Sequence, residues 1–141
     1  MIYRRKIPVE FNHCDPAGIV FYPRYLEMTN SLVENFFREV MDYPFARMMG
    51  EGVGTPTVKL SMDFRAPSRL GEVLDWTLSV LRIGRTSAKL RIVAHGSDAK
   101  LRLQGEVTLV FAALTGKALP WPDPIWSRLE TMRQREPNEP A

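Results

Sequence analysis

The sequence predicts an α+β domain in which a curved antiparallel sheet wraps around one long central helix. Apolar residues recur with a helical period from residue 23 to about residue 41. They then alternate with polar residues in four segments between residues 58 and 111, joined by short turns, which is typical of an antiparallel meander. With 141 residues, 45% hydrophobic and 25% charged, the chain has the size and composition of one soluble domain, expected to span residues 1–141.

The first predicted element is a short strand. Ile7, Val9 and Phe11 alternate with Pro8, Glu10 and Asn12, which indicates a half-buried strand. Pro8 has no N–H for a strand ladder, so we expect this strand at an edge of the sheet.

A constrained turn follows in residues 12–23, which read Asn-His-Cys-Asp-Pro-Ala-Gly-Ile-Val-Phe-Tyr-Pro. Pro16 biases Asp15 toward extended backbone, and Gly18 can adopt positive φ at little cost. Pro23 suits the first turn of a helix. We therefore expect a carboxylate on a rigid turn just before a helix N-terminus, where free N–H groups and the positive dipole end can stabilise an oxyanion.

The long helix should run from about residue 23 to residue 41, and we interpret its apolar side as core. Its apolar residues are Tyr25, Met28, Leu32, Val33, Phe36, Phe37, Val40 and Met41. Tyr43-Pro44 should break the helix, and residues 45–49 can add a further turn before a glycine-rich loop.

The four alternating segments should each bury one face. Their inward residues are expected to be Val58, Leu60, Met62 and Phe64; Leu74, Trp76, Leu78 and Val80; Ala88, Leu90, Ile92 and Ala94; and Leu101, Leu103, Val107, Leu109 and Phe111. From about residue 120, a proline-rich segment leads to a short helix predicted from Ile125 to Arg135. Residues 136–141 are expected to be frayed.

Charge and composition argue against several partners. The net charge of +3 is mild, the basic residues are scattered and no nucleic-acid motif is present, so we expect no nucleic-acid partner. No apolar run approaches the roughly 18 residues of a membrane span, so we expect no membrane contact. A single cysteine, Cys14, and the lack of a secretory apolar segment favour the cytoplasm.

Several standard sites are missing from the sequence. There is no nucleophile elbow, phosphate loop, dinucleotide fingerprint or Cys-x-x-Cys pair. His13 and Cys14 are adjacent and would point to opposite faces of extended backbone, which argues against a shared metal or a cysteine–histidine nucleophile. We therefore expect no metal site and a small, buried Cys14. Spacing leaves two interpretations of Asp15 open: a turn or capping carboxylate, and a catalytic one.

The segment from Asp15 to Tyr25 closely resembles the active-site segment of 4-hydroxybenzoyl-CoA thioesterases of the hotdog fold. Residues 54–56 are similar to the start of that family's second strand, and residues 64–67 followed by Gly71-Glu72 are similar to its break between sheet strands. The resemblance implies a hydrolase that cleaves an acyl-CoA thioester, with an aryl or short acyl group, to free acid and coenzyme A. It also implies no bound cofactor or metal, and assembly as a homodimer or as a homotetramer made of two dimers.

The resemblance also implies roles for particular residues. The family aspartate falls on Asp15 and acts as nucleophile or as general base toward water. The N–H that polarises the thioester carbonyl falls on Tyr22. The turn of residues 82–87 resembles an arginine-containing strand junction, so Arg85 and then Arg82 are candidates for the phosphates of coenzyme A, although both are equally interpretable as solvated arginines.

Five further residues are candidates for substrate contact. They are Phe21, Tyr25, Met28, Asn30 and Thr55. Asn30 stands where 4-hydroxybenzoyl enzymes carry an acidic residue, and this weakens the case for 4-hydroxybenzoate as the acyl group.

Three alternatives stay open. A non-catalytic acyl-CoA-binding hotdog module would bind without turnover, and a nucleic-acid-binding protein would show a steep salt dependence of affinity. Hotdog hydratases share the fold but use a different acid/base arrangement, and no Asp/His pair on the early helix matches it.

Overall fold

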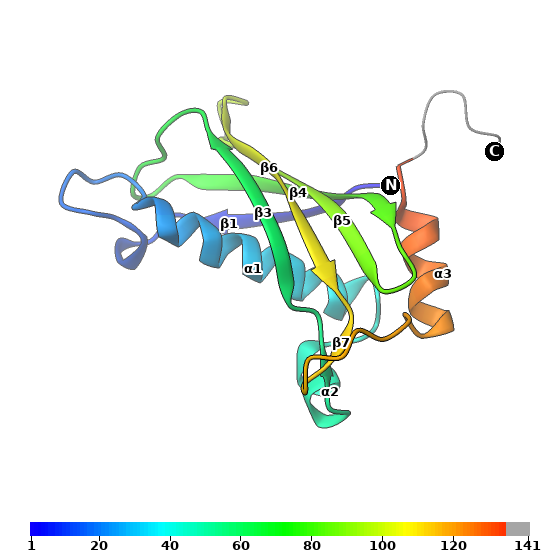
Figure 1. Ribbon diagram of the computed structural model, residues 1–141. Helices are drawn as coiled ribbons and strands as arrows, with labels where there is room; N and C mark the ends of the chain where they lie inside the picture. The colour runs from blue at the N-terminus through cyan, green and yellow to red at the C-terminus, as the bar shows by residue number, and fades with distance from the viewer. Residues whose placement is uncertain (135–141) are drawn as a thin grey trace.

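The computed structural model describes residues 1–134, and its elements are shown in Figure 1. The strands are β1 (Tyr3–Pro8), β2 (Val53–Gly54), β3 (Thr57–Phe64), β4 (Val73–Ile83), β5 (Ser87–His95), β6 (Leu101–Val110) and β7 (Ala112–Ala113). The helices are α1 (Tyr22–Glu39), α2 (Phe45–Gly50) and α3 (Asp123–Met132), with a short 3-10 turn, η1, at Phe11–His13.

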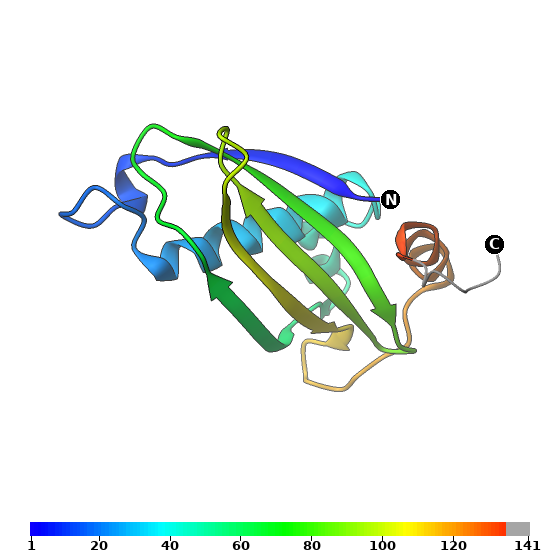
Figure 2. The same ribbon diagram turned by 90° about the horizontal axis from the view of Figure 1, so that it is seen from above.

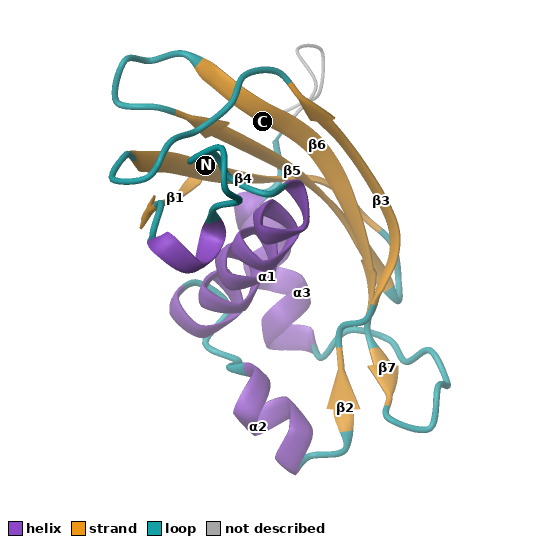
Figure 3. Ribbon diagram, turned by 90° about the vertical axis from the view of Figure 1, so that its left-hand side faces the viewer, coloured by secondary structure: helices purple, strands orange, loops and turns teal. Residues whose placement is uncertain are grey.

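Five strands form one antiparallel sheet in the order β1-β4-β5-β6-β3. Strands β4, β5 and β6 form the predicted meander, while β1 and β3 are the two edges. Figure 3 shows the sheet curving around α1, and Figure 2 shows α1 lying beneath it along its length. This is the predicted α+β architecture, a curved sheet wrapped around a central helix, and β1 lies at an edge as Pro8 indicates.

The core lies between α1 and the inner face of the sheet. The apolar stripe of α1 and the inward residues of β4 and β5 are almost wholly buried, as the two periodicities predict. Helix α1 starts one residue and ends two residues earlier than expected, and α2 supplies the further turn after Pro44.

The prediction that β3 buries one face is wrong for this chain. The fractional exposures of Val58, Leu60 and Phe64 are 61%, 43% and 46%. Strand β3 is an edge strand that pairs only with β6, and its inner face is separated from α1 by cavities instead of being packed closely against it.

The expected strand through Phe11 is also wrong. Strand β1 ends at Pro8, and the last backbone bond to the neighbouring segment runs from Val9 N–H to Glu72 O at 2.8 Å. The chain then turns through η1, where Glu10 N–H donates to His13 Nδ1 at 2.8 Å. Phe11 is consequently 84% exposed.

The C-terminal helix begins earlier than predicted, at Asp123, because the prolines that flank this residue suit a helix start. Its last described turn ends at Met132, while Arg135 and residues 136–141 lie outside the described residues. Helix α3 lies beyond the end of β4, at the opposite end of the molecule from the start of α1 (Figures 1 and 2). Within residues 1–134, no helix combines the length and apolar character needed to cross a bilayer.

Candidate active site

The Asp15 turn is closed by its own backbone. Cys14 and Val20 form an antiparallel bridge, and Asp15 N–H donates to Ile19 O at 3.0 Å. Inside the loop, Gly18 N–H donates to Asp15 O at 2.9 Å, and Gly18 itself has a positive φ of +78°, which a glycine adopts at little cost. Ala17 N–H donates to Asp15 Oδ1 at 2.9 Å. Among residues 1–134, Asp15 Oδ2 accepts no hydrogen bond, so one carboxylate oxygen is free to react.

The start of α1 provides a free donor beside this turn. Val20 N–H donates to Ser68 O, and Phe21 N–H donates to His13 O, each at 2.9 Å. Tyr22 is the first residue of α1, and its N–H finds no acceptor among the described residues. Asp15 is one residue from the Cys14–Val20 bridge and Tyr22 is two residues from it, so the bridge holds together the two chain segments that carry these groups.

A groove of about 550 Å³ opens in front of this helix start. Its walls are formed by Val20, Tyr22, Tyr25, Phe64, Arg65, Ala66 and Pro67. The rings of Tyr25 and Phe64 stack with centroids 5.6 Å apart, and the ring of Tyr22 meets Phe64 edge-on at 6.1 Å. The groove therefore presents mainly aromatic surface at the start of α1, where Val20 and Tyr22 line it, whereas Asp15 is not one of its lining residues.

A second cavity of about 200 Å³ lies farther along α1, again between this helix and β3. It is lined by Leu26, Thr29, Asn30, Val33, Phe45, Thr55, Thr57, Leu60, Val107 and Leu109. Its apolar walls thus carry a few hydrogen-bonding groups, which is the usual composition of a small-molecule pocket.

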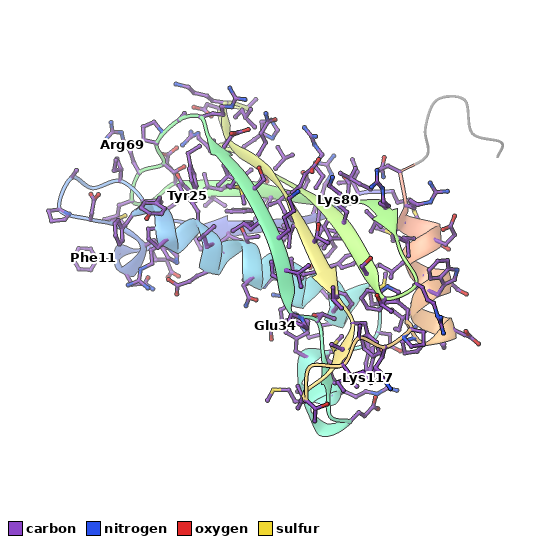
Figure 4. The ribbon with its side chains drawn as sticks, in the orientation of Figure 1. Phe11, Tyr25, Glu34, Arg69, Lys89 and Lys117 are labelled. Atoms are coloured by element: carbon purple, nitrogen blue, oxygen red, sulfur yellow. The ribbon has the colours of Figure 1, made fainter. Side chains whose placement is uncertain are left out.

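The structure brings some of the sequence-predicted residues together. Asp15 and Phe21 precede the start of α1, Tyr22 and Tyr25 lie in its first turn and line the groove, and Figure 4 shows Tyr25 at that end of the molecule, with Phe11 and Arg69. Asn30 and Thr55, 25 positions apart in sequence, face the same second cavity.

Three of the predicted residues lie elsewhere. Met28 is 3% exposed in the core and lines neither cavity, because it lies on the side of α1 that faces the sheet. Arg82 and Arg85 are exposed at the β4–β5 turn. This turn lies at the end of the sheet near α3, so within one chain both arginines are remote from Asp15.

Sequence reasoning missed the wall formed by residues 64–67, because it assigned Phe64 to the buried face of a strand and the following residues to a break between strands. Arg65 supplies the one charged side chain in the groove lining of the described chain. A strand that ends in Arg-Ala-Pro gives no pattern that distinguishes a cavity wall from an ordinary connection, so this part of the site required the structure.

The Tyr25 hydroxyl is buried behind the groove and donates to Ser68 Oγ at 2.9 Å. Burial raises the pKa of Tyr25, while its hydrogen bond to Ser68 and the charge of Arg102 partly oppose that rise. Tyr25 is therefore a neutral hydroxyl at physiological pH. Within residues 1–134, no three His, Cys, Asp or Glu side chains lie close enough together to hold a metal ion.

An antiparallel sheet curved around one central helix is the architecture of the hotdog fold, which thioester hydrolases use. The model of the thioesterase-like superfamily matches residues 9–129, and the chain belongs to that family.

Comparison with known proteins identifies similar enzymes. The chain is 29% identical over 117 residues to a 4-hydroxybenzoyl-CoA thioesterase from Pseudomonas sp. (strain CBS-3), a match that spans 79% of this chain and 83% of that enzyme.

Two solved structures share the fold. A 1,4-dihydroxy-2-naphthoyl-CoA thioesterase from Synechocystis superposes with a TM-score of 0.84 at 21% identity, covering 92% of this chain and 96% of the other. A hypothetical protein from Staphylococcus aureus in complex with CoA superposes with a TM-score of 0.86 at 13% identity, covering 96% and 88%.

Proposed function

We propose that this protein hydrolyses an acyl-CoA thioester to the free acid and coenzyme A, with Asp15 as the essential carboxylate and the Tyr22 N–H as the oxyanion donor. The observation that carries the proposal is that the Cys14–Val20 bridge joins a segment with one free carboxylate oxygen to a segment with one free helix N–H. Attack on a thioester carbonyl needs these two functions.

The chemistry follows from these two groups. As the carbonyl is attacked, negative charge develops on its oxygen, and a fixed N–H donor at that position lowers the barrier by about 3 kcal/mol. Asp15 either attacks the carbonyl carbon, giving an anhydride that water then opens, or takes a proton from the attacking water. In both routes the C–S bond breaks and coenzyme A leaves as a thiolate. Because a thiolate leaves far more readily than an amine, a single carboxylate can be enough, and no metal or cofactor takes part in the proposed reaction.

The walls favour an aryl or short acyl group. The groove beside the reacting groups presents Tyr22, Tyr25 and Phe64, which suit flat apolar substrates. The curated relative acts on 4-hydroxybenzoyl-CoA, an aryl substrate. In the second cavity, Asn30 offers an uncharged amide where an acidic side chain would bind a hydroxyl group on the substrate ring. We therefore propose that the acyl group is aromatic and that it does not need a ring hydroxyl.

The phosphates of coenzyme A would be bound across a dimer. The pairs Ser87–Val110 and Leu109–Thr57 place the β4–β5 turn at the end of the sheet where β3 begins. Phe64, at the other end of β3, contacts Tyr22 at the start of α1. Antiparallel pairing of two exposed β3 edges would therefore bring Arg82 and Arg85 of a second copy toward the Asp15 end of the first.

We accordingly propose a homodimer formed by pairing of two β3 strands, and two such dimers can form a homotetramer. The predicted location is the cytoplasm. Both arginines are exposed and available to phosphate oxygens, although this position is equally that of solvated side chains.

The test is turnover of 4-hydroxybenzoyl-, phenylacetyl- and short aliphatic CoA thioesters by wild type and Asp15→Asn, followed as release of free thiol. We expect kcat to fall by at least about 10³-fold in Asp15→Asn, because the reacting group is removed while its size is kept. Asp75→Asn is the matched control. Asp75 lies on β4, where it forms only a weak ion pair with Lys6 at 4.0 Å, so the kcat of this variant should match wild type.

Two outcomes would contradict the proposal. Retained turnover in folded Asp15→Asn would remove Asp15 from its role. Saturable acyl-CoA binding by wild type without any turnover would instead favour the non-catalytic binding module.

A further inference from the structure

One buried cation, Arg102, lies behind the wall of the groove. Arg102 is 3% exposed and belongs to β6. Ala94 pairs with Leu103 while His95 pairs with Leu101, so Arg102 is the extra residue of a β-bulge and has no partner on β5. Bulges redirect side chains. Here both Arg102 and its neighbour Leu103 are buried, which regular alternation on a one-sided sheet would not allow.

The two terminal nitrogens of Arg102 bind two different sets of acceptors. Nη2 donates to Glu72 Oε2 at 2.8 Å and to both carboxylate oxygens of Asp98 at 3.1 Å. The hydrogen bond from Arg102 holds the pKa of the Glu72 carboxyl below its ordinary value, so this carboxyl is ionised at neutral pH. Nη1 donates to Pro67 O at 3.0 Å and to Ser68 Oγ at 3.3 Å. Arg102 Nε has no acceptor among residues 1–134, so only the hydrogen bonds of Nη1 and Nη2 hold the guanidinium in place.

The Nη1 partners belong to the segment that supports the candidate active site. Ser68 is fully buried, and its Oγ accepts a hydrogen bond from the Tyr25 hydroxyl. Its backbone oxygen accepts from the N–H of Val20, the residue that closes the Asp15 turn. The next residues continue this support, since Arg69 forms a bridge with Ile19 and Leu70 N–H donates to Gly18 O at 3.3 Å. Figure 4 shows Arg69 and Tyr25 at the same end of the molecule.

The backbone of Arg102 holds the groove wall as well. Its carbonyl accepts from Arg65 N–H at 2.8 Å and from Ala66 N–H at 3.3 Å. Arg65, Ala66 and Pro67 all line the groove. One residue thus binds the wall through its main chain and the support of the Asp15 turn through its side chain.

The chain leaves room for this guanidinium at Gly96. A Cβ at Gly96 would lie 2.2 Å from Arg102 Nη2 and 2.7 Å from its Cζ. Any larger residue at this position would therefore displace the guanidinium from its acceptors.

We propose that Arg102 is a positioning residue, which acts through Ser68 to hold the Asp15 turn and the Tyr25 ring in the geometry of the reaction. This inference rests on the proposed function. Lysine cannot replace arginine here, because a single ammonium can keep the ion pair with Glu72 and Asp98 but cannot also reach Pro67 O and Ser68 Oγ. The charge would be kept and the link to the active site lost.

The experiment compares Arg102→Lys and Ser68→Ala with wild type at a temperature where circular dichroism shows each protein folded. We expect kcat to fall about 10- to 100-fold in Arg102→Lys with KM changed less than about threefold, because misplacement of reacting groups affects the transition state more than ground-state binding. A role in stability alone would leave kcat per folded molecule unchanged. Ser68→Ala should likewise lower kcat while leaving KM nearly unchanged. This variant still tests the inference if Arg102→Lys fails to fold.

Arg128→Lys is the matched control. Arg128 is partly buried on α3 and its Nη1 donates to Met41 O at 2.7 Å, so it also holds a backbone carbonyl, but one far from Asp15. Its kcat should stay within about twofold of wild type, since its acceptor, Met41 O, makes no contact with the segment that supports the Asp15 turn.

Amide hydrogen exchange at Val20 supplies a readout that does not depend on turnover. Its N–H is bonded to Ser68 O, so Arg102→Lys should accelerate its exchange, while Arg128→Lys should not. Unchanged kcat together with unchanged Val20 exchange in Arg102→Lys would overturn the inference. If wild type hydrolyses no thioester, the proposed function fails, and Val20 exchange alone then decides whether Arg102 positions the turn.

Discussion

Strands β3 and β5 have the same alternation of apolar and polar residues but very different surroundings. The inward residues of β5, among them Leu90 and Ile92, are wholly buried, whereas Leu60 on β3 is 43% exposed. Strand β5 has a neighbour on each side, while β3 pairs only with β6. Alternation therefore tells which side chains share a face, and packing of α1 against that face decides whether it is covered.

The difference also locates the candidate active site. Where the inner face of β5 is covered there is core, and where the inner face of β3 is uncovered there are cavities. Phe64 of β3 lines the groove at the start of α1, and Leu60 lines the cavity with Asn30. Incomplete packing at one sheet edge thus provides the space that a substrate needs.

Truncation in β5 should give the largest effect. Ile92→Ala leaves a cavity in the covered core, so the free energy of unfolding should fall by about 2–5 kcal/mol, measured by urea denaturation. The same truncation on β3, Leu60→Ala, should cost less than about 1 kcal/mol in the monomer. Equal losses at the two positions would show that β3 is covered as well as β5.

Gly105→Ala tests the contact between β6 and β3. An added Cβ would lie 2.1 Å from Ser61 O and 2.9 Å from the Met62 Cα, so β3 would have to shift. We expect a loss of about 1–3 kcal/mol in the free energy of unfolding. Gly50→Ala is the matched control, because a Cβ there meets no atom within 4 Å and the residue lies in α2. That variant should be unchanged or slightly more stable, by up to about 1 kcal/mol, and a similar loss in both variants would refute the steric explanation.

Leu60→Lys should have the smallest effect on the folded chain and act mainly on association. A charge on an exposed edge opposes strand pairing, so the dissociation constant of the proposed dimer should rise at least about tenfold, measured by sedimentation equilibrium. Leu114→Lys, at an exposed leucine outside β3, should leave association unchanged. A dimer that resists Leu60→Lys must use a surface other than the β3 edge.

The sequence predicted the architecture well because its periodicities are long and regular. The 18 residues of α1 and the 11 residues of β4 each carry a pattern that only one structure satisfies. The strand at residues 7–11 failed for the opposite reason. Three alternating residues are too few to outweigh a local turn, and the hydrogen bond between Glu10 and His13 ended the strand near Pro8.

The candidate site was predictable where its residues are contiguous. Asp15 and Tyr22 lie in one short motif, and the proline and glycine positions already implied a rigid turn before a helix. The roles of Ser68 and Arg102 depend on contacts across 34 residues or more, and on a bulge that shifts the pairing by one residue. A pattern read along the chain carries no information about such contacts.

The bridge between Cys14 and Val20 has a consequence for how proteins of this kind diversify. Backbone hydrogen bonds between residues 13 and 21, together with Ser68, hold the carboxylate and the N–H. None of these bonds involves the side chains of Asn30, Thr55 or Leu60, which line the second cavity. In the proposed reaction, substitutions along that cavity would alter the acid that fits while the backbone bonds that hold Asp15 and Tyr22 stay unchanged. A proposed family of related enzymes could in this way accept different acids through one unchanged turn.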